Sequence, residues 1–366
     1  MGTVAALGGH PVGVAAPRTI EVHRDVGSIE DEWDRLALQA DASIFARPAW
    51  LRIWWEVFGA GELEILALRE AGELVAVLPL TRTGSRLAAP VNEHTPLYDP
   101  PARDAGAAEA LYAAVLGGRA RRLRIAEIEA RDTTTGALVK AAARHGWRLR
   151  VRPLRHAPYR RVTGSVGDYL ASVSKDRRKA MRRRRRRLEE GGEVTIEWVD
   201  GSERLDELLD EGLAVEGSGW KAAAGTAINS RAETDRYYRA IAEWAASVSA
   251  LELGFVRLDG RAIAFQLALW DETSCYALKA GFDPEFRKVG PGVLLLHDMI
   301  VRAHERRVET VELLGDATDF KLSWGPLTRE VVRMQAFGPG LPGSADWLAS
   351  SYVRPLLNKV TEGIRR

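Results

Sequence analysis

Hydrophobic and polar residues alternate along the chain with two periods, one typical of strands and one typical of helices. Residues 19–23 alternate as in a strand, and residues 28–38 place apolar side chains at helical spacing. Residues 48–58 predict a second helix, which opens on a proline and ends before a glycine. Residues 63–68 and 73–80 predict two strands joined by a short turn, as in a hairpin.

The same two periods continue through the rest of the chain. They predict further helices at 105–116, 136–145, 203–215, 232–246 and 292–306. They predict further strands at 122–128, 147–151, 194–199, 251–258, 261–270, 273–281 and 308–314. The turn Asp259-Gly260 suits the positive φ of a type I′ hairpin. This mixture of elements predicts an α/β fold (α+β with mixed sheets).

The order of these elements occurs twice, which favours a duplicated domain. Residues 63–69, Leu-Glu-Ile-Leu-Ala-Leu-Arg, align with residues 251–257, Leu-Glu-Leu-Gly-Phe-Val-Arg. Two unrelated hairpin units would match as well by chance, but the shared order of elements favours duplication. A proline-rich stretch at 153–158 suggests the boundary. We therefore predict four segments: a disordered tail at 1–17, domains at 18–155 and 156–340, and an amphipathic helix at 341–366.

The composition is that of a globular protein with nearly balanced charge. Of 366 residues, 46% are hydrophobic, and 52 Lys+Arg stand against 50 Asp+Glu. A globally basic nucleic-acid-binding protein is therefore not indicated. The single cysteine, Cys275, cannot form an internal disulfide, which predicts a reducing, cytoplasmic location. Its strand-like surroundings favour a packed side chain over a nucleophile.

Other features exclude some functions. No stretch approaches the ~18 apolar residues that span a bilayer, so we expect no stable membrane insertion. The first 17 residues lack the basic start of a signal peptide. The histidines show no metal-ligand spacing, so no metal is expected. Trp50, Trp54 and Trp55 are expected in a core or a domain interface.

The segment 281–292 carries the most specific chemistry, because it joins a predicted strand to a predicted helix. The first turn of a helix leaves backbone N–H groups free to bind an anion such as a phosphate. Gly290 and Gly292 would let that anion approach the backbone closely, while Arg287 and Lys288 add positive charge. The alternative is a tight Gly-Pro-Gly turn that binds nothing.

Arg287-x-x-Gly290-x-Gly292 resembles the acyl-CoA loop Arg/Gln-x-x-Gly-x-Gly/Ala of the Gcn5-related N-acetyltransferases, the GNAT superfamily. The wider pattern resembles the CelD/BcsL-type acetyltransferases, which are associated with cellulose biosynthesis and related to the FemABX aminoacyl transferases. The matching residues are Tyr169–Lys175, Gly219-Trp220-Lys221, Gly281-Phe282-Asp283, Gly315-Asp316 and Phe320-Lys321, with Trp324-Gly325.

This resemblance implies tandem GNAT-like domains in a Fem-like arrangement, with acyl-CoA, such as acetyl-CoA, as the co-substrate. The donor would contact the loop residues Arg287, Lys288, Val289, Gly290, Gly292 and Val293. Its pantetheine arm would lie between strands 273–280 and 308–314, where a backbone N–H polarises the thioester carbonyl. The first half has no comparable glycine loop and is not expected to bind CoA.

The remaining site residues are assigned more loosely. Glu216 is a candidate general base, although a solvated carboxylate at a helix end is the alternative. Asp316 follows a predicted strand and is a second candidate. Phe320 stands where relatives carry a tyrosine acid, so Tyr276 or water would replace it. The resemblance places Trp220, Lys221, Phe320 and Lys321 at the substrate.

Residues 175–187 predict a strongly basic helix that ends in six consecutive arginines. Like charges this close repel one another, so an anion is expected nearby. Local acids such as Glu189 and Glu190, the CoA phosphates, an acidic acceptor and tRNA are the alternatives.

The sequence therefore predicts an acyl-CoA-dependent N-acyltransferase that acts on a small amine or amino sugar. An acyl carrier protein is an alternative donor. The alternative functions are a Fem-like transferase that uses aminoacyl-tRNA and a non-catalytic GNAT-fold binding module.

Overall fold

The computed structural model describes residues 17–218, 228, 231–340, 343 and 347. The first half contains strands β1 (Arg18–His23), β2 (Glu62–Glu70), β3 (Glu73–Thr83), β4 (Arg86–Ala88), β5 (Arg122–Glu129) and β6 (Arg148–Arg161). Its helices are α1 (Glu30–Gln39), α2 (Pro48–Phe58), α3 (Ala105–Gly117) and α4 (Thr133–Arg144).

The second half begins with two helices that have no counterpart in the first, α5 (Val166–Ser172) and α6 (Lys175–Glu189). Its strands are β7 (Val194–Val199), β8 (Leu251–Leu258), β9 (Arg261–Trp270), β10 (Ser274–Phe282), β11 (Thr310–Glu312) and β12 (Leu327–Phe337). Its other helices are α7 (Leu205–Gly217), α9 (Ala232–Ser247), α10 (Pro291–Arg306) and α11 (Asp319–Trp324).

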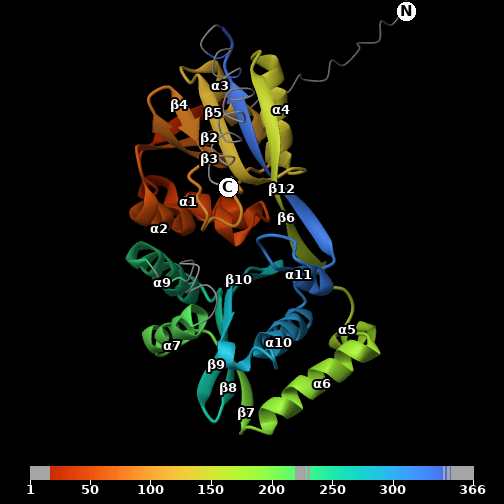
Figure 1. Ribbon diagram of the computed structural model, residues 1–366. Coiled ribbons are helices and arrows are strands. Elements are labelled where there is room, and N and C mark those ends of the chain that lie inside the picture. The colour runs from red at the N-terminus through yellow and green to blue at the C-terminus, as the bar shows by residue number, and fades with distance from the viewer. Residues whose placement is uncertain (1–16, 219–227, 229–230, 341–342, 344–346, 348–366) are drawn as a thin grey trace, which may run out of the picture.

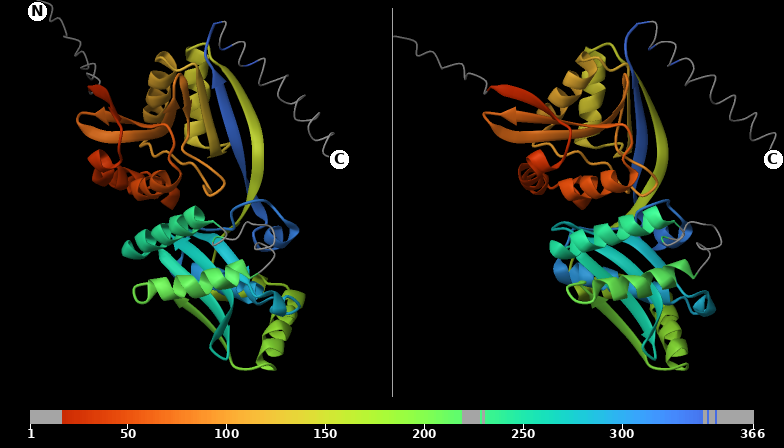
Figure 2. Two further views of the ribbon diagram at one scale, coloured as in Figure 1. Left: turned by 60° about the vertical axis from the view of Figure 1, so that its left-hand side comes forward. Right: turned by 90° about the vertical axis from the view of Figure 1, so that its left-hand side faces the viewer.

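The two halves repeat one order of elements, strand, two helices, three strands, helix, strand, helix and strand (Figure 1). Their strands join in one mixed sheet of 12 strands, with the order β1-β2-β3-β4-β5-β12-β6-β11-β10-β9-β8-β7. Helices cover both faces of the sheet in each half (Figure 2). The predicted mixed α/β fold with a duplicated unit is confirmed.

The halves exchange their last strands. β12 belongs to the second half by sequence, but it pairs with β5 of the first half from Val331 to Phe337. β6 belongs to the first half and pairs with β11 of the second through Tyr159, Arg160 and Arg161. β6 and β12 also pair with each other along their length. Each half is therefore completed by a strand from the other.

The predicted boundary between residues 155 and 156 falls inside β6, which is continuous and serves both halves. Pro153 and Pro158 suggested a linker, yet both lie within this strand. A proline cannot donate a ladder hydrogen bond, so it is tolerated where a strand has a free side. From Arg148 to Pro158, β6 pairs with β12 alone among the described strands.

Tryptophans of the first half pack against tyrosines of the second. Trp50 and Trp54 on α2 are buried in one hydrophobic cluster with Tyr237 and Tyr238 on α9. The rings of Trp50 and Tyr237 meet edge to face, with centroids 6.0 Å apart. This shared cluster holds the two halves together beside the exchanged strands.

Several elements differ from the sequence prediction. The strand predicted at 308–314 is limited to Thr310–Glu312, and β4, α11 and β12 were not predicted. The basic stretch forms α6, separated from α5 by a break near Val173. The predicted tail at 1–17 and the helix at 341–366 fall almost entirely outside the described residues. No helix among the described residues is long and apolar enough to cross a membrane.

The strand exchange predicts that a change in β12 destabilises the core of the first half. Met334 is fully buried in a cluster made otherwise mostly of first-half residues. Replacing it with alanine should cost about 2–5 kcal/mol of unfolding free energy, because the cavity would be poorly refilled. Urea denaturation measures the loss, and hydrogen exchange should locate it in α3 and β5.

The neighbouring half-buried Gln335 provides the control, since Gln335→Ala leaves this cluster unchanged. If the Met334 variant lost protection from hydrogen exchange only in the second half, that result would contradict the exchange of strands between the halves.

Candidate active site

The functional region predicted from the sequence lies where β10 and β11 run parallel and then separate. The two strands pair at three positions, the last of which joins Tyr276 to Glu312. Beyond this pair β10 has a bulge between Ala277 and Lys279. The buried Gln266 donates its side-chain amide to the carbonyl of Lys279 at 2.9 Å and stabilises the bulge. A bulge increases local twist, so β10 diverges from β11 here.

The glycine loop, residues 287–292, follows the C-terminal end of β10. Gly290 donates its N–H to the carbonyl of Phe286 at 2.8 Å and has φ +66°. This left-handed conformation suits glycine and lets α10 begin at Pro291. A Cβ at Gly292 would lie no closer than 3.9 Å to a neighbouring atom, so the surface beside Gly292 is open.

The corresponding helices of the two halves, α3 and α10, begin differently. α3 is capped by Asp104, whose carboxylate accepts the N–H of Ala107 at 2.9 Å. The N-cap of α10 is Gly290, which has no side chain to act as a cap. An incoming phosphate would meet a carboxylate at α3. At α10 it would meet the N–H of Gly292, because the N–H groups of Gly290 and Val293 already donate to the carbonyls of Phe286 and Gly290. The favourable helix dipole is therefore available to a ligand anion at α10.

The six predicted donor-contact residues fall together on this loop and the first turn of α10. Arg287 and Lys288 are exposed, and the other four are half-buried: Val289, Gly290, Gly292 and Val293. The loop is thus reachable from solvent and carries two cations at its outer edge.

The three predicted catalytic residues are not brought together. Tyr276 lies at the last β10–β11 pair, whereas Glu216 packs at the other end of β10, against Gly281. Asp316 is exposed in the loop after β11.

Glu216 is 2% exposed, so the alternative reading of a solvated carboxylate is wrong. Its carboxylate accepts the backbone N–H of Ile228 at 3.1 Å. A Cβ at Gly281 would overlap the Cα of Glu216, so only glycine allows α7 to approach β10 this closely.

The predicted substrate residues are also dispersed. Trp220 and Lys221 lie outside the described residues. Phe320 on α11 is 51% exposed. Lys321 donates from Nζ to the carbonyl of Leu314 at 2.6 Å and so fixes the turn after β11.

A cavity of about 570 Å³ between the two halves reaches the separating strands from the other side. Residues 96–105, Glu129 and residues 132–134 of the first half line it, among others. From the second half it is lined by Ser274, Tyr276 and Glu312, among others. The point where β10 and β11 part is therefore accessible from the domain interface.

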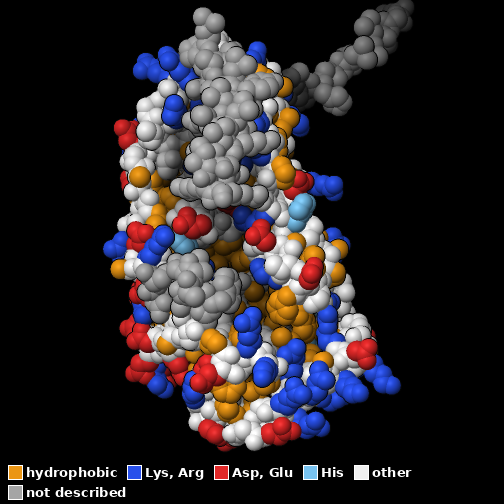
Figure 3. Space-filling model, in the orientation of Figure 1, with side chains coloured by type: hydrophobic (Ala, Val, Ile, Leu, Met, Phe, Trp, Pro, Cys, Tyr) orange, Lys and Arg blue, Asp and Glu red, His pale blue; other side chains and the backbone are white. Residues whose placement is uncertain are grey.

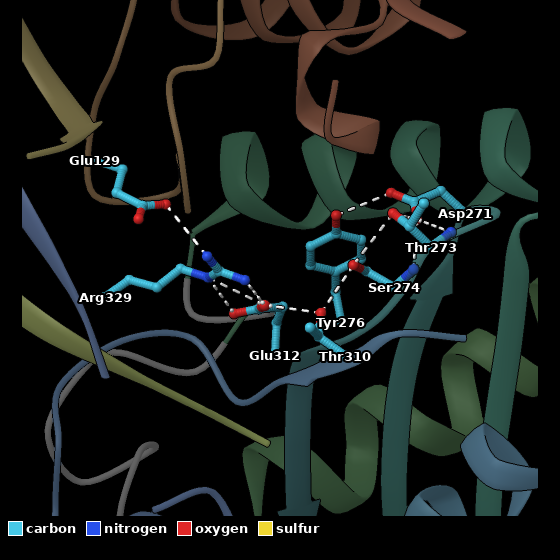
Figure 4. Close-up of polar contacts among 8 residues, drawn as sticks. All are labelled: Glu129, Asp271, Thr273, Ser274, Tyr276, Thr310, Glu312 and Arg329. Carbon is cyan, nitrogen blue, oxygen red and sulfur yellow. Dashed lines mark hydrogen bonds and ion pairs between the residues drawn. The ribbon is translucent and has the colours of Figure 1, made fainter. Parts of the chain in front are cut away.

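A polar network crosses this cavity wall (Figure 4). The buried Glu312 accepts from Nη2 of Arg329 at 2.9 Å and from the hydroxyl of Thr310 at 2.9 Å. Arg329 also lies 3.5 Å from Glu129 on β5 and 4.2 Å above the ring centroid of Tyr159. The network joins β5, β6, β11 and β12, so the carboxylate of Glu312 is held in one position.

Tyr276 belongs to a neighbouring group in the same wall. Its hydroxyl donates to Oδ2 of Asp271 at 2.8 Å. Asp271 is further bound by the backbone N–H groups of Thr273 and Ser274, at 3.0 and 2.7 Å. Burial, followed by the Asp271 charge, raises the pKa of Tyr276 above its ordinary value. The phenol therefore keeps its proton at neutral pH.

The cavity wall is rich in carboxylates. Burial raises the pKa of Asp99 to about 6, although Ser43 donates its backbone N–H to this carboxylate at 2.7 Å. Burial likewise raises the pKa of Glu129. Asp132 and Glu309 line the same cavity. Its electrostatics favour a cationic over an anionic occupant.

Sequence reasoning missed Glu312, Arg329 and Asp271. The signal for Glu312 was a charged residue in an apolar stretch, Val-Glu-Leu, at a predicted strand. Arg329 is 17 residues away from Glu312 on a strand that was not predicted. Glu312 and Arg329 come together because β11 and β12 lie on either side of β6 in the sheet.

Residues 175–322 match the family model of the acetyltransferase (GNAT) domain. The matched residues lie in the second half of the chain. Comparison with curated proteins gave no significant match.

Among solved structures, FemX superimposes with a TM-score of 0.60 at 13% identity, covering 86% of this chain and 96% of FemX. A conserved protein of unknown function from Bacteroides thetaiotaomicron gives 0.58 at 12% identity, with 87% and 100% covered. The C-terminal domain of a putative lysylphosphatidylglycerol synthetase from Agrobacterium fabrum gives 0.52 at 14% identity, with 89% and 96% covered. These likenesses concern the fold, and they confirm the predicted Fem-like arrangement of tandem GNAT units.

The raised pKa of Asp99 predicts a specific dependence of stability on pH. The folded protein holds the Asp99 proton up to about pH 6, whereas an unfolded aspartate releases it near 3.8. Between these values the folded state binds more protons, so rising pH removes stability through this group. The unfolding free energy of Asp99→Asn, relative to that of the wild type, should therefore rise by about 1–2 kcal/mol between pH 4.5 and pH 7.5.

Urea denaturation of both proteins at the two pH values gives this difference directly. If the two proteins differed in unfolding free energy by the same amount at both pH values, Asp99 would ionise normally in the folded state.

Proposed function

We propose that the protein is an acyl-CoA-dependent N-acyltransferase that transfers an acyl group, such as acetyl, to a small amine. The observation that carries this proposal is the start of α10, where Gly290 and Gly292 leave the first turn open beside two parting strands. The match of residues 175–322 to the GNAT domain supports the same reaction class. The CelD/BcsL-like motifs support membership of that narrower group and make an amino sugar a suitable acceptor.

The donor would bind with its diphosphate at the loop and its pantetheine arm directed between β10 and β11. The start of α10 supplies the N–H of Gly292 and the positive end of the helix dipole. Arg287 and Lys288 supply the neighbouring positive charge. The thioester would then reach the bulge after Ala277, where a backbone N–H polarises its carbonyl.

The acceptor would enter through the cavity between the halves. Its carboxylate-rich wall attracts an amine, and the cavity ends at Tyr276 and Glu312 beside the parting strands. The amine nitrogen attacks the thioester carbonyl carbon, the carbon–sulfur bond breaks, and an amide and a thiol result. The amine must lose a proton and the thiolate must gain one.

Tyr276 fits the role of proton donor to the thiolate. It lies at the last β10–β11 pair and lines the cavity, and its hydroxyl, which donates to Asp271 at 2.8 Å, would have to turn from Asp271 to the thiolate. Glu216 and Asp316 remain candidates for the proton acceptor, because each lies beside β10 or β11.

A Fem-like transferase that uses aminoacyl-tRNA is the second candidate. The exposed basic residues of α6 favour it, since phosphate contacts need no aromatic partners. Strongly salt-dependent binding of tRNA, without binding of CoA, would favour this function over the first. A protein that binds neither and hydrolyses no thioester would be a non-catalytic binding module.

Acetyl-CoA should raise the melting temperature of the wild type, and Gly292→Val should abolish this rise. A Cβ at Gly292 meets its nearest neighbour only at 3.9 Å, so the fold should be preserved while the valine blocks the approach to the first turn of α10. Isothermal titration should show at least about a tenfold loss of affinity.

Gly136→Ala on α4 is the matched control, because this glycine also has open space around it and lies away from the loop. Unchanged CoA affinity in the Gly292 variant would contradict the donor site.

Tyr276→Phe should lower kcat by about 100-fold or more without changing the affinity for acetyl-CoA, because it removes the proton donor and, besides it, one hydrogen bond to Asp271. Asp271 keeps its backbone partners in this variant. Steady-state kinetics with a panel of amines measures the effect. A wild-type kcat would remove Tyr276 from the mechanism.

A further inference from the structure

The basic helix α6 is held in place against the donor side of the second half. Leu188 is 2% exposed and packs in a cluster with Leu294 and Leu295 of α10. At the other end, Arg177 lies 4.6 Å from the ring centroid of Trp324 on α11 and donates to the carbonyl of Ser323 at 2.7 Å. α6 therefore spans from α11 to the glycine loop.

These two anchors direct one arginine of the run at the loop itself. Nη1 of Arg184 donates to the carbonyl of Val289. A Cβ at Gly290 would lie 2.7 Å from this nitrogen, so the guanidinium sits beside the N-cap of α10. Arg184 is half-buried, whereas its neighbours Arg183 and Arg185 are exposed.

The charge on Arg184 has no carboxylate partner among the described residues. Arg185 and Arg186, by contrast, pair with Glu189 and Glu190. A cation beside the positive end of a helix dipole is electrostatically unfavourable by itself. Arg287 and Lys288 add further positive charge to the same loop. An anion bound at the loop would offset this repulsion.

We propose that Arg184 is a ligand of the donor's diphosphate, contributed by a helix outside the Arg287–Gly292 motif. A guanidinium presents several N–H donors in a planar fork that suits phosphate oxygens. One donor holds the carbonyl of Val289, which leaves the others for the phosphate oxygens. This inference rests on the proposed use of an acyl-CoA donor.

The surface around Arg184 supports this role. Lys and Arg side chains gather over α6 (Figure 3). Lys179, Arg182, Arg183 and Arg187 are exposed on this helix, and none pairs with a carboxylate of the described chain. Such a surface draws an anionic donor toward the loop. Arg184 is the residue of the run that reaches the binding position.

The test separates the charge of Arg184 from its hydrogen bond to Val289. Arg184→Gln keeps an N–H donor for the carbonyl but removes the charge, and Arg184→Ala removes both. Arg183→Gln is the matched control, because it removes one charge from the same helix without touching the loop. Each variant is compared with the wild type for acetyl-CoA and for S-acetyl-pantetheine, which has no phosphate.

Arg184→Gln and Arg184→Ala should both raise the KM for acetyl-CoA by about 10- to 100-fold. Neither should change kcat/KM for S-acetyl-pantetheine. Arg183→Gln removes only one of several surface charges and should raise the KM for acetyl-CoA far less than either Arg184 variant. Equal losses with both donors, or wild-type kinetics in Arg184→Gln, would overturn the proposal and leave Arg184 as a structural residue. Failure of the wild type to bind acetyl-CoA would overturn the proposed function itself, which titration of the wild type decides first.

Discussion

The antiparallel pairing of β6 with β12 is the constraint on which the rest of the structure depends. The pairing extends from Leu327 with Tyr159 to Phe337 with Arg148, so it crosses the junction between the halves. β12 places Val332, Met334 and Ala336 in the core of the first half. Neither half has a complete sheet without the other. The relative position of the halves is therefore set by backbone hydrogen bonds as well as by side-chain packing, and the cavity between them is a fixed feature of the fold.

The same pairing assembles the polar wall of the candidate site. Arg329 lies on β12, Glu312 on β11 and Glu129 on β5, three strands that come together only through the exchange. Burying the carboxylate of Glu312 without a cation would cost several kcal/mol, so Arg329 is needed for this wall to form. The strands that join the halves also carry charges that line the cavity between them.

The sequence predicted features that depend on local pattern and missed those that depend on sheet order. The hairpin at Asp259-Gly260 was predicted with its strand ends because turn chemistry and alternation agree there. The glycine loop was predicted because its residues are consecutive. β6 was cut short at Pro153, which signals a linker unless one side of the strand is unpaired. The ion pair of Glu312 with Arg329 and the contact of Arg184 with Val289 follow from tertiary packing, which no local pattern encodes.

The two halves differ most informatively at the starts of α3 and α10. An aspartate cap such as Asp104 stabilises a helix by about 0.5–2 kcal/mol. Its carboxylate, however, fills the position that a phosphate would take and repels the negative charge of the phosphate. Gly290 has no side chain to cap α10, so α10 lacks this stabilisation. α10 is held instead by the burial of Leu294, Leu295 and Met299 along its length. The second half can therefore keep an open helix start, while the first half, with its helix closed, contributes a wall of the cavity. Under the proposed function, the duplicated fold would divide donor and acceptor binding between its copies.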